Sequence, residues 1–235
     1  MTTAEVRMWG RTIGAVSLES GRDVAAFQYA PDFAGSGIQP APLTMPLSET
    51  VYEFPALPSM TFHGLPGLLA DSLPDKFGNV LIDAWLATQG RAPERFDAVE
   101  RLCYIGTRGM GALEFKPVLG TRQRQSSKID IDALVRLAGE VLTQRGNLSA
   151  HFHEAGRERA LRSILSVGTS AGGARAKAVI AWNRVTNEVR SGQVAAGDGF
   201  DYWLLKFDGV AGNRDKVLED PKGDGAIEFA YYLLA

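Results

Sequence analysis

The chain of 235 residues is long enough for one large domain or two smaller ones, and its 45% hydrophobic and 22% charged residues are ordinary for a globular protein. Its formal charge is -2, with basic and acidic residues interspersed, which excludes the charge pattern of a protein that binds DNA or an anionic membrane. The single cysteine, Cys103, excludes an internal disulfide, and we expect it to be a core thiol. Neither a signal-peptide core nor a bilayer-spanning apolar run is found, so we expect a cytoplasmic protein without a membrane partner.

Extended structure is predicted at the start of the chain. Over residues 6–29 apolar residues alternate around glycines, and residues 19–22 supply a turn, so this segment is interpreted as a β-hairpin. Residues 31–58 hold six prolines and show little periodicity. That composition favours an irregular connector with a short strand at 50–54.

Two helices and a strand are predicted next. Apolar residues recur at helical spacing over 79–89, and Gly90 is suited to end that helix. Residues 97–103 show a second helical pattern. Three closely spaced glycines then lead into a strand at 112–115.

Two groups of polar residues invite a metal-site hypothesis. Asp71 and Asp75 form an acidic pair, but the preferred interpretation is structural: Asp71 lies in a turn before Pro74, and Asp75 caps the following helix or starts a turn. His151 and His153 alternate as a zinc-binding pair would. Because no cysteine or third histidine lies nearby in the sequence, we expect no metal ligands.

The polar, basic run at residues 120–128 has no apolar anchors and is interpreted as a linker. The sequence therefore predicts an α+β protein with a β-rich N-terminal subdomain that contains helices over 1–120, a linker at 121–128 and a second domain over 129–235. The second domain is expected to begin with an amphipathic helix at 129–145, where apolar residues follow the i, i+3, i+4, i+7 pattern.

A glycine-rich turn precedes a strand predicted at 177–182. Gly168, Gly172 and Gly173, with alanines around them, leave little side-chain bulk, so backbone N–H groups can approach a phosphate closely. A P-loop is excluded because alanine and arginine follow where lysine and Ser/Thr are required. A dinucleotide-binding loop is disfavoured because the glycines open a strand rather than a helix. A hairpin turn without a ligand remains the alternative.

Lys206 stands in the middle of an apolar strand predicted at 202–207. Burying an ammonium group without a partner is costly, so this lysine either has an anionic partner or extends to the edge of the sheet. Glu228, on an amphipathic segment at 227–234, is a candidate carboxylate to orient Lys206. The alternative for Glu228 is a favourable charge in the first turn of a helix.

Several of these segments resemble the HipA family of serine/threonine protein kinases, the toxin components of bacterial toxin–antitoxin pairs. Residues 170–177, Ser-Ala-Gly-Gly-Ala-Arg-Ala-Lys, are similar to that family's glycine-rich loop. Residues 202–206 resemble its nucleotide-binding lysine strand, and residues 228–235 resemble the helix that follows. Residues 62–78 and 106–115 resemble its N-terminal subdomain. The resemblance covers essentially the whole chain.

The resemblance implies that residues 129–235 begin a partial kinase-like nucleotide lobe, an antiparallel sheet with helices, that binds ATP with Mg²⁺. It further implies a protein substrate phosphorylated on Ser or Thr, a HipB-like antitoxin with a helix-turn-helix, and contact with DNA only through that antitoxin. Ser170 matches the loop serine that family members phosphorylate on themselves, and the added charge would repel ATP phosphates. The cofactor-binding residues implied are Ser170, Ala171, Gly172, Gly173, Ala174, Lys206 and Glu228.

The chain departs from the family pattern after Lys206, where no catalytic Asp followed by Asn and no metal-binding Asp is recognised. Asp208 and Asp224 are interpreted as loop residues. We therefore expect the N-terminal part of a kinase that does not transfer phosphate by itself. Two alternatives stay open: a non-catalytic module that binds an antitoxin or a separate kinase chain, and a small-molecule kinase of related architecture.

Overall fold

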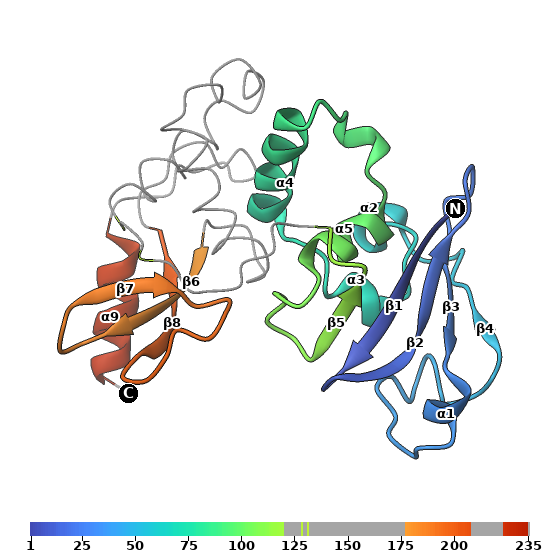
Figure 1. Ribbon diagram of the computed structural model, residues 1–235, viewed down its shortest axis with the longest axis horizontal. Coiled ribbons are helices and arrows are strands. Elements are labelled where there is room, and N and C mark those ends of the chain that lie inside the picture. Colours follow the sequence, from blue (N-terminus) through green and yellow to red (C-terminus); the bar gives the residue numbers. More distant parts are fainter. Residues whose placement is uncertain (120–127, 129–130, 132–176, 208–222, 235) are drawn as a thin grey trace. The chain divides into compact units, whose positions relative to one another are not determined.

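The computed structural model describes residues 1–119, 128, 131, 177–207 and 223–234. The chain forms two compact units, drawn in Figure 1. The first unit joins Met1–Leu73 to Glu94–Arg122, and the second joins Pro74–Pro93 to Gln123–Ala235. The chain thus leaves the first unit early, contributes one segment to the second unit and then returns.

A five-stranded antiparallel sheet forms the first unit, in the order β4-β3-β2-β1-β5 (Figure 1). β1 and β2 are joined by Trp9 and Gly10, whose φ angles of 50° and 75° suit the tight turn that matches strand twist. The hairpin predicted over 6–29 is therefore two consecutive hairpins. The strands are β1 Thr2–Met8, β2 Arg11–Leu18, β3 Ala26–Tyr29, β4 Val51–Tyr52 and β5 Leu113–Lys116.

Helix α5 packs against β1, β2 and β5 and contributes buried side chains to the first unit's core. It begins with a capping box, in which the Asp97 carboxylate accepts from the Glu100 N–H at 2.8 Å and the Glu100 carboxylate accepts from the Asp97 N–H at 3.0 Å. The helix predicted at 97–103 is thus present. The helices of this unit are α1 Pro31–Ala34, α2 Ser59–Phe62, α3 Gly67–Ala70 and α5 Ala98–Ile105, and a 3-10 helix spans Pro93–Arg95.

The core of the first unit follows from the alternation of apolar residues along its strands. Every second residue of β1 faces inward, from Ala4 to Met8. Tyr29 is buried among aromatic neighbours, and its hydroxyl donates to the Met45 carbonyl at 2.9 Å, which satisfies the polar end of the ring. The largest fully buried members of this core are Phe27, Tyr29, Phe33, Phe115, Ile13, Met45, Leu65 and Leu69.

Helix α4, Lys76–Thr88, belongs to the second unit. Asp75 is its N-cap, and the Asp75 carboxylate accepts from the Gly78 N–H at 2.7 Å. Gly90, at a φ of 67°, lies just after the end of the helix, as predicted. Among the described side chains of α4, those of Leu81, Ile82, Ala84 and Leu86 are fully buried, and none of them is part of the first unit's core.

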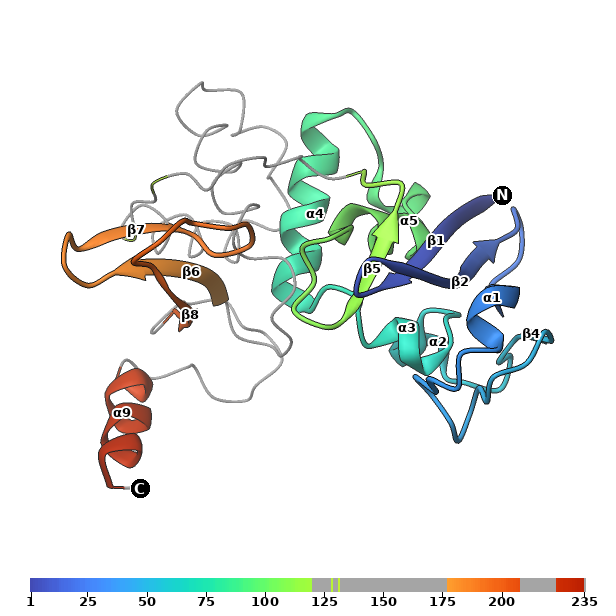
Figure 2. The same ribbon diagram turned by 60° about the horizontal axis from the view of Figure 1, so that its bottom comes forward.

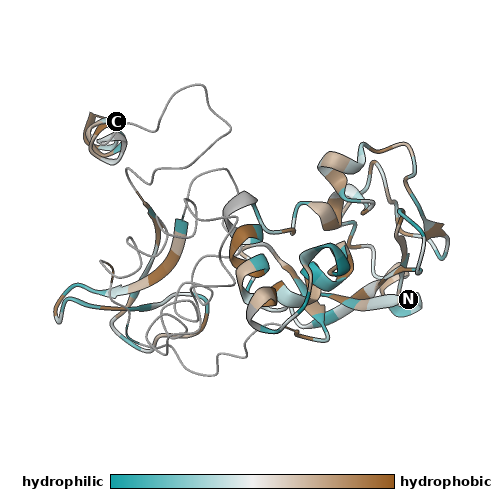
Figure 3. Cartoon of the chain, turned by 90° about the horizontal axis from the view of Figure 1, so that it is seen from above, coloured by the Kyte–Doolittle hydropathy of each residue, from teal (hydrophilic) through white to brown (hydrophobic). Residues whose placement is uncertain are grey.

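Within its described residues, the second unit contains a three-stranded antiparallel sheet in the order β7-β6-β8 (Figure 2). The strands are β6 Lys177–Asn183, β7 Glu188–Ser191 and β8 Asp201–Lys206, and the helix α9 spans Asp224–Leu234. Helix α9 is amphipathic in sequence, and Figure 3 shows brown, hydrophobic residues along it. Its described side chains are all exposed.

The α+β class predicted from the sequence is confirmed, with a β-rich N-terminal sheet and a second, separate three-stranded sheet. Strands expected at 50–54, 112–115, 177–182 and 202–207 are all present, with ends shifted by at most two residues. The linker at 121–128 and the helix at 129–145 lie outside the described residues, apart from Lys128 and Ile131. The division into domains at these positions stays a prediction.

Candidate functional site

Two lysines meet at one end of the second unit's sheet. Lys177 is the first residue of β6 and Lys206 is the last residue of β8, and the antiparallel register places them directly opposite one another. Side chains of directly opposed residues leave the same face of a sheet, with their Cβ atoms about 5 Å apart. Two ammonium groups therefore start from neighbouring positions on one face.

Lys206 pairs with Glu228 on helix α9. The Lys206 Nζ donates to both carboxylate oxygens of Glu228, at 2.7 and 3.0 Å. The side chains of Lys206 and Glu228 are 45% and 52% exposed, so the pair remains open to solvent. The orientation of Lys206 by Glu228, one of the two interpretations drawn from the sequence, is thus the geometry observed. The carboxylate holds the amine in place while leaving it accessible to an anion.

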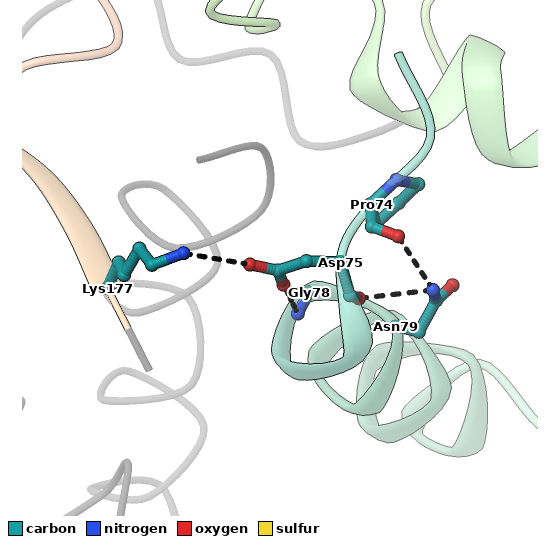
Figure 4. A network of polar contacts seen from close by, with 5 residues as sticks. All are labelled: Pro74, Asp75, Gly78, Asn79 and Lys177. Atoms are coloured by element: carbon teal, nitrogen blue, oxygen red, sulfur yellow. Dashed lines mark hydrogen bonds and ion pairs between the residues drawn. The ribbon is translucent and has the colours of Figure 1, made fainter. Parts of the chain in front are cut away.

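Lys177 pairs with Asp75 in a different environment. The Lys177 Nζ lies 3.9 Å from Asp75 Oδ2, and the two side chains are only 10% and 7% exposed (Figure 4). The other Asp75 oxygen, Oδ1, accepts from the Gly78 N–H and caps α4. Of the two roles predicted for Asp75, the helix cap is therefore the one observed, and the same carboxylate also pairs with a lysine about a hundred residues further along the chain.

The remaining predicted site residues lie outside the described part of the chain. These are the glycine-rich turn residues Ser170, Ala171, Gly172, Gly173 and Ala174. Their assignment to phosphate binding stays a prediction, as does self-phosphorylation at Ser170. Lys177, the residue that ends the loop motif, was assigned no role from the sequence. Its place opposite Lys206 is a consequence of strand register, which local sequence does not reveal.

The opposite face of this sheet carries an aromatic cluster with one arginine. The Trp182 and Trp203 rings lie 6.2 Å apart, edge to face, and the Arg184 guanidinium lies 4.9 Å from the Trp203 ring centre and 5.6 Å from that of Trp182. Arg184 also lies 3.5 Å from the Asp201 carboxylate. This cation is thus held by partners on the face away from the two lysines.

The donor set at the two lysines suits phosphate rather than a metal ion. Ammonium groups attract anionic oxygens, whereas magnesium requires several oxygen ligands. Within the described ranges, no three or more His, Cys, Asp or Glu side chains gather as they would around a metal ion. These residues therefore do not by themselves provide a magnesium site. In the same ranges no helix has the length and apolarity needed to cross a membrane.

Comparison with known proteins identifies the first part of the chain. Residues 4–116 match the HipA N-terminal domain family, and this match spans β1 to β5 together with α4 and α5. No curated protein matches the chain. The chain therefore carries a HipA N-terminal domain, as its residues 62–78 and 106–115 predicted, and this domain indicates a HipA-like protein of a toxin–antitoxin system. The three-stranded sheet and α9 lie after the matched residues.

Proposed function

We propose that the second unit is the nucleotide-binding lobe of a HipA-like serine/threonine protein kinase. In this proposal ATP binds with its phosphates at Lys206, and the complete enzyme transfers the γ-phosphoryl group to a Ser or Thr of a protein target, with Mg²⁺. The observation that carries the proposal is the ion pair between Lys206 and Glu228. A strand lysine oriented by a helix glutamate is the arrangement with which protein kinases position the amine that neutralises ATP phosphates.

The environment of the pair supports this role. β8 lies at the edge of the described sheet, so the Lys206 side chain could extend into solvent, but its amine instead makes two close contacts with one carboxylate. An exposed ion pair contributes little to stability, with a median of about 0–1 kcal/mol. A contribution to stability therefore explains the presence of the Lys206–Glu228 ion pair poorly. Phosphate binding explains it better, because it requires an accessible, oriented amine.

The HipA N-terminal domain supports the rest of the proposal. In the toxin–antitoxin setting that this domain indicates, we propose that a HipB-like antitoxin with a helix-turn-helix binds the protein, and that DNA is reached only through the antitoxin. We also propose that the backbone of residues 171–174 covers the phosphates and that Ser170 is a self-phosphorylation site. Because no catalytic Asp or metal-binding acid was recognised in the sequence, we expect ATP binding without phosphate transfer by this chain alone.

The test is ATP binding by the full chain, measured by isothermal titration calorimetry, with a Lys206→Ala variant. We expect the variant to bind ATP at least about tenfold more weakly, because a charge-assisted contact to phosphate is worth roughly 1.5–3 kcal/mol. Arg184→Ala is the matched control, since it removes a carboxylate-paired cation from the opposite face of the same sheet. We expect the control to bind ATP as the wild type does.

Equal ATP affinity of the wild type and Lys206→Ala would contradict the proposed role of Lys206. Lys206→Arg offers a further comparison, because it keeps the charge but changes the shape of the donor group. We expect Lys206→Arg to recover part of the lost affinity. An equal loss in Arg184→Ala would point to a general effect of positive charge on the sheet rather than to a phosphate site.

A second candidate is a non-catalytic interaction module, favoured by the apolar surface of β8 and α9. Large apolar side chains in both elements are more than two-fifths exposed, which is typical of surfaces that bind another protein. Co-purification with a separately expressed antitoxin or kinase chain, together with absent ATP binding, would favour this candidate. The exposed residues are Tyr202, Trp203, Leu204, Ile227, Phe229, Tyr231, Tyr232, Leu233 and Leu234.

A further inference from the structure

Asp75 is held in a fixed orientation at the start of α4, as Figure 4 shows. Its Oδ1 accepts from the Gly78 N–H at 2.7 Å. The Asn79 side-chain amide donates to the carbonyls of Pro74 and Asp75, at 2.9 and 3.1 Å, which fixes the backbone on both sides. The Oδ2 atom is therefore presented to Lys177 by a rigid support, and the direction of the ion pair is set by α4 rather than by a flexible side chain.

The two lysines of the site differ in how strongly their carboxylates hold them. Glu228 contacts the Lys206 amine at hydrogen-bond distance, whereas Asp75 Oδ2 lies 3.9 Å from the Lys177 amine, beyond that distance. Like charges placed directly opposite one another in a sheet repel. Asp75 and Glu228 therefore serve as counter-ions that make this lysine pair tolerable.

We propose that Asp75 is a built-in competitor for the amine of Lys177, the lysine that ends the glycine-rich loop motif, and that a polyphosphate displaces Asp75 on binding. The proposal rests on the proposed nucleotide-binding function and adds a residue pair to it. The ligand class is a di- or triphosphate, because two amines that leave one sheet face from neighbouring strands can contact phosphate groups that are linked to each other. Asp75 thereby sets how readily the site accepts its anion.

The burial of the Asp75–Lys177 ion pair determines whether Asp75 raises or lowers the affinity for an anion. With Asp75 present, the buried Lys177 charge is compensated before the ligand arrives. The binding free energy of an incoming phosphate is then only the difference between its attraction to Lys177 and that of Asp75. Without the Asp75 charge, the buried ammonium loses this counter-ion, and a phosphate would relieve the resulting cost on binding. Loss of the carboxylate should therefore strengthen anion binding while it weakens the unliganded fold.

The experiment uses Asp75→Asn in the full chain, with inorganic tripolyphosphate and ATP as probes. Asparagine caps helices about as well as aspartate, so this change removes the charge but retains an acceptor for the Gly78 N–H. We expect Asp75→Asn to bind tripolyphosphate at least about fivefold more tightly than the wild type. We also expect a lower Tm without ligand and a larger rise in Tm on adding tripolyphosphate.

Lys177→Met identifies the amine responsible. We expect this variant to bind tripolyphosphate more weakly than the wild type, and we expect the double variant Asp75→Asn/Lys177→Met to show no gain over Lys177→Met alone. Asp97→Asn is the matched control, because it removes a carboxylate from a helix N-cap of the first unit. A purely structural role of Asp75 would lower stability without raising anion affinity.

The outcomes separate this inference from the proposed function. If the wild type binds ATP through Lys206 but Asp75→Asn shows no gain in affinity, the competitor role is wrong and the nucleotide site stands. If Asp75→Asn gains tripolyphosphate binding while ATP binding does not depend on Lys206, the anion site stands and the kinase-lobe assignment fails. Lys177→Met with wild-type tripolyphosphate affinity would overturn the inference even if Asp75→Asn does not fold.

Discussion

The thiol of Cys103 shows how burial removes the reactivity of a single residue. Cys103 is 1% exposed on α5, within the first unit's core. Burial away from water raises its pKa to about 11, and the nearby Asp97 and Glu100 carboxylates add to the shift because they disfavour a thiolate. The thiolate is the reactive form, so the folded protein presents an inert cysteine at neutral pH.

This shift has a consequence for stability in alkali. The unfolded thiol ionises near its ordinary pKa of 9.0, while the folded thiol keeps its proton to about pH 11. The stabilisation from the neutral thiol is therefore complete below pH 9 and is lost as the pH rises toward 11. We expect the free energy of unfolding to fall by about 1 kcal/mol between pH 8 and pH 10 from this group.

Urea unfolding at pH 8 and pH 10 checks this expectation, with Cys103→Ala as the comparison. The alanine variant should start with lower stability because it leaves a small cavity, but it should lose about 1 kcal/mol less over the same pH interval. Parallel pH curves for the two proteins would mean that the thiol does not titrate differently in the folded state. Tyr29, whose pKa burial raises to about 12, contributes mainly above pH 10.

Single residues also show how far the sequence determines the site. Lys206 was singled out because a lysine is unusual in an apolar strand, and Glu228 because its helix follows, so local chemistry was sufficient to predict their ion pair. For Asp75 the sequence left a helix cap and the start of a turn open, and the cap is the geometry observed. The pairing of Asp75 with Lys177 was not foreseen, because the pair depends on how two distant segments pack. Local periodicity contains no information on that packing.

At the scale of elements, the pairing of β2 with β3 depends on the absence of a side chain at Gly14. A Cβ atom placed there would lie 2.8 Å from the Phe27 ring and would also overlap the Gln28 carbonyl. We expect Gly14→Ala to lower the free energy of unfolding by about 1–3 kcal/mol, as overpacked core substitutions do. Gly35→Ala, at a position with open space around it, is the control and should have little effect. Chemical denaturation of both variants provides the measurement.

Some helices, strands and turns were predicted from the sequence more accurately than others, for physical reasons. Helix α4 was placed over 79–89 but begins at Lys76, because Gly78 in its first turn weakened the helical pattern, whereas the Asp75 cap marks the true start. The turn at Trp9 and Gly10 was missed because tryptophan rarely adopts a positive φ, and only the glycine signalled it. Strands β6 and β8 were found because both segments are short and largely apolar.

At the scale of the whole molecule, two units predict two unfolding events. Their sheets share no strands, so each unit has its own cooperative structure. We expect urea unfolding to show two transitions, with Gly14→Ala lowering the midpoint of one. Gly192→Ala should lower the midpoint of the other, since a Cβ there would lie 2.7 Å from the Ile180 backbone of β6. A shift of the same single transition by both variants would indicate that the units unfold together.

The excursion of the chain into the second unit has a consequence for biosynthesis. α4 leaves the ribosome well before the strands of its own unit, while the first unit can complete its sheet as soon as β5 has emerged. Until the rest of the second unit appears, Leu81, Ile82 and Leu86 lack the contacts that bury them in the folded chain. A chaperone that binds exposed apolar helices would therefore bind α4 most readily while residues between 119 and 177 are being synthesised.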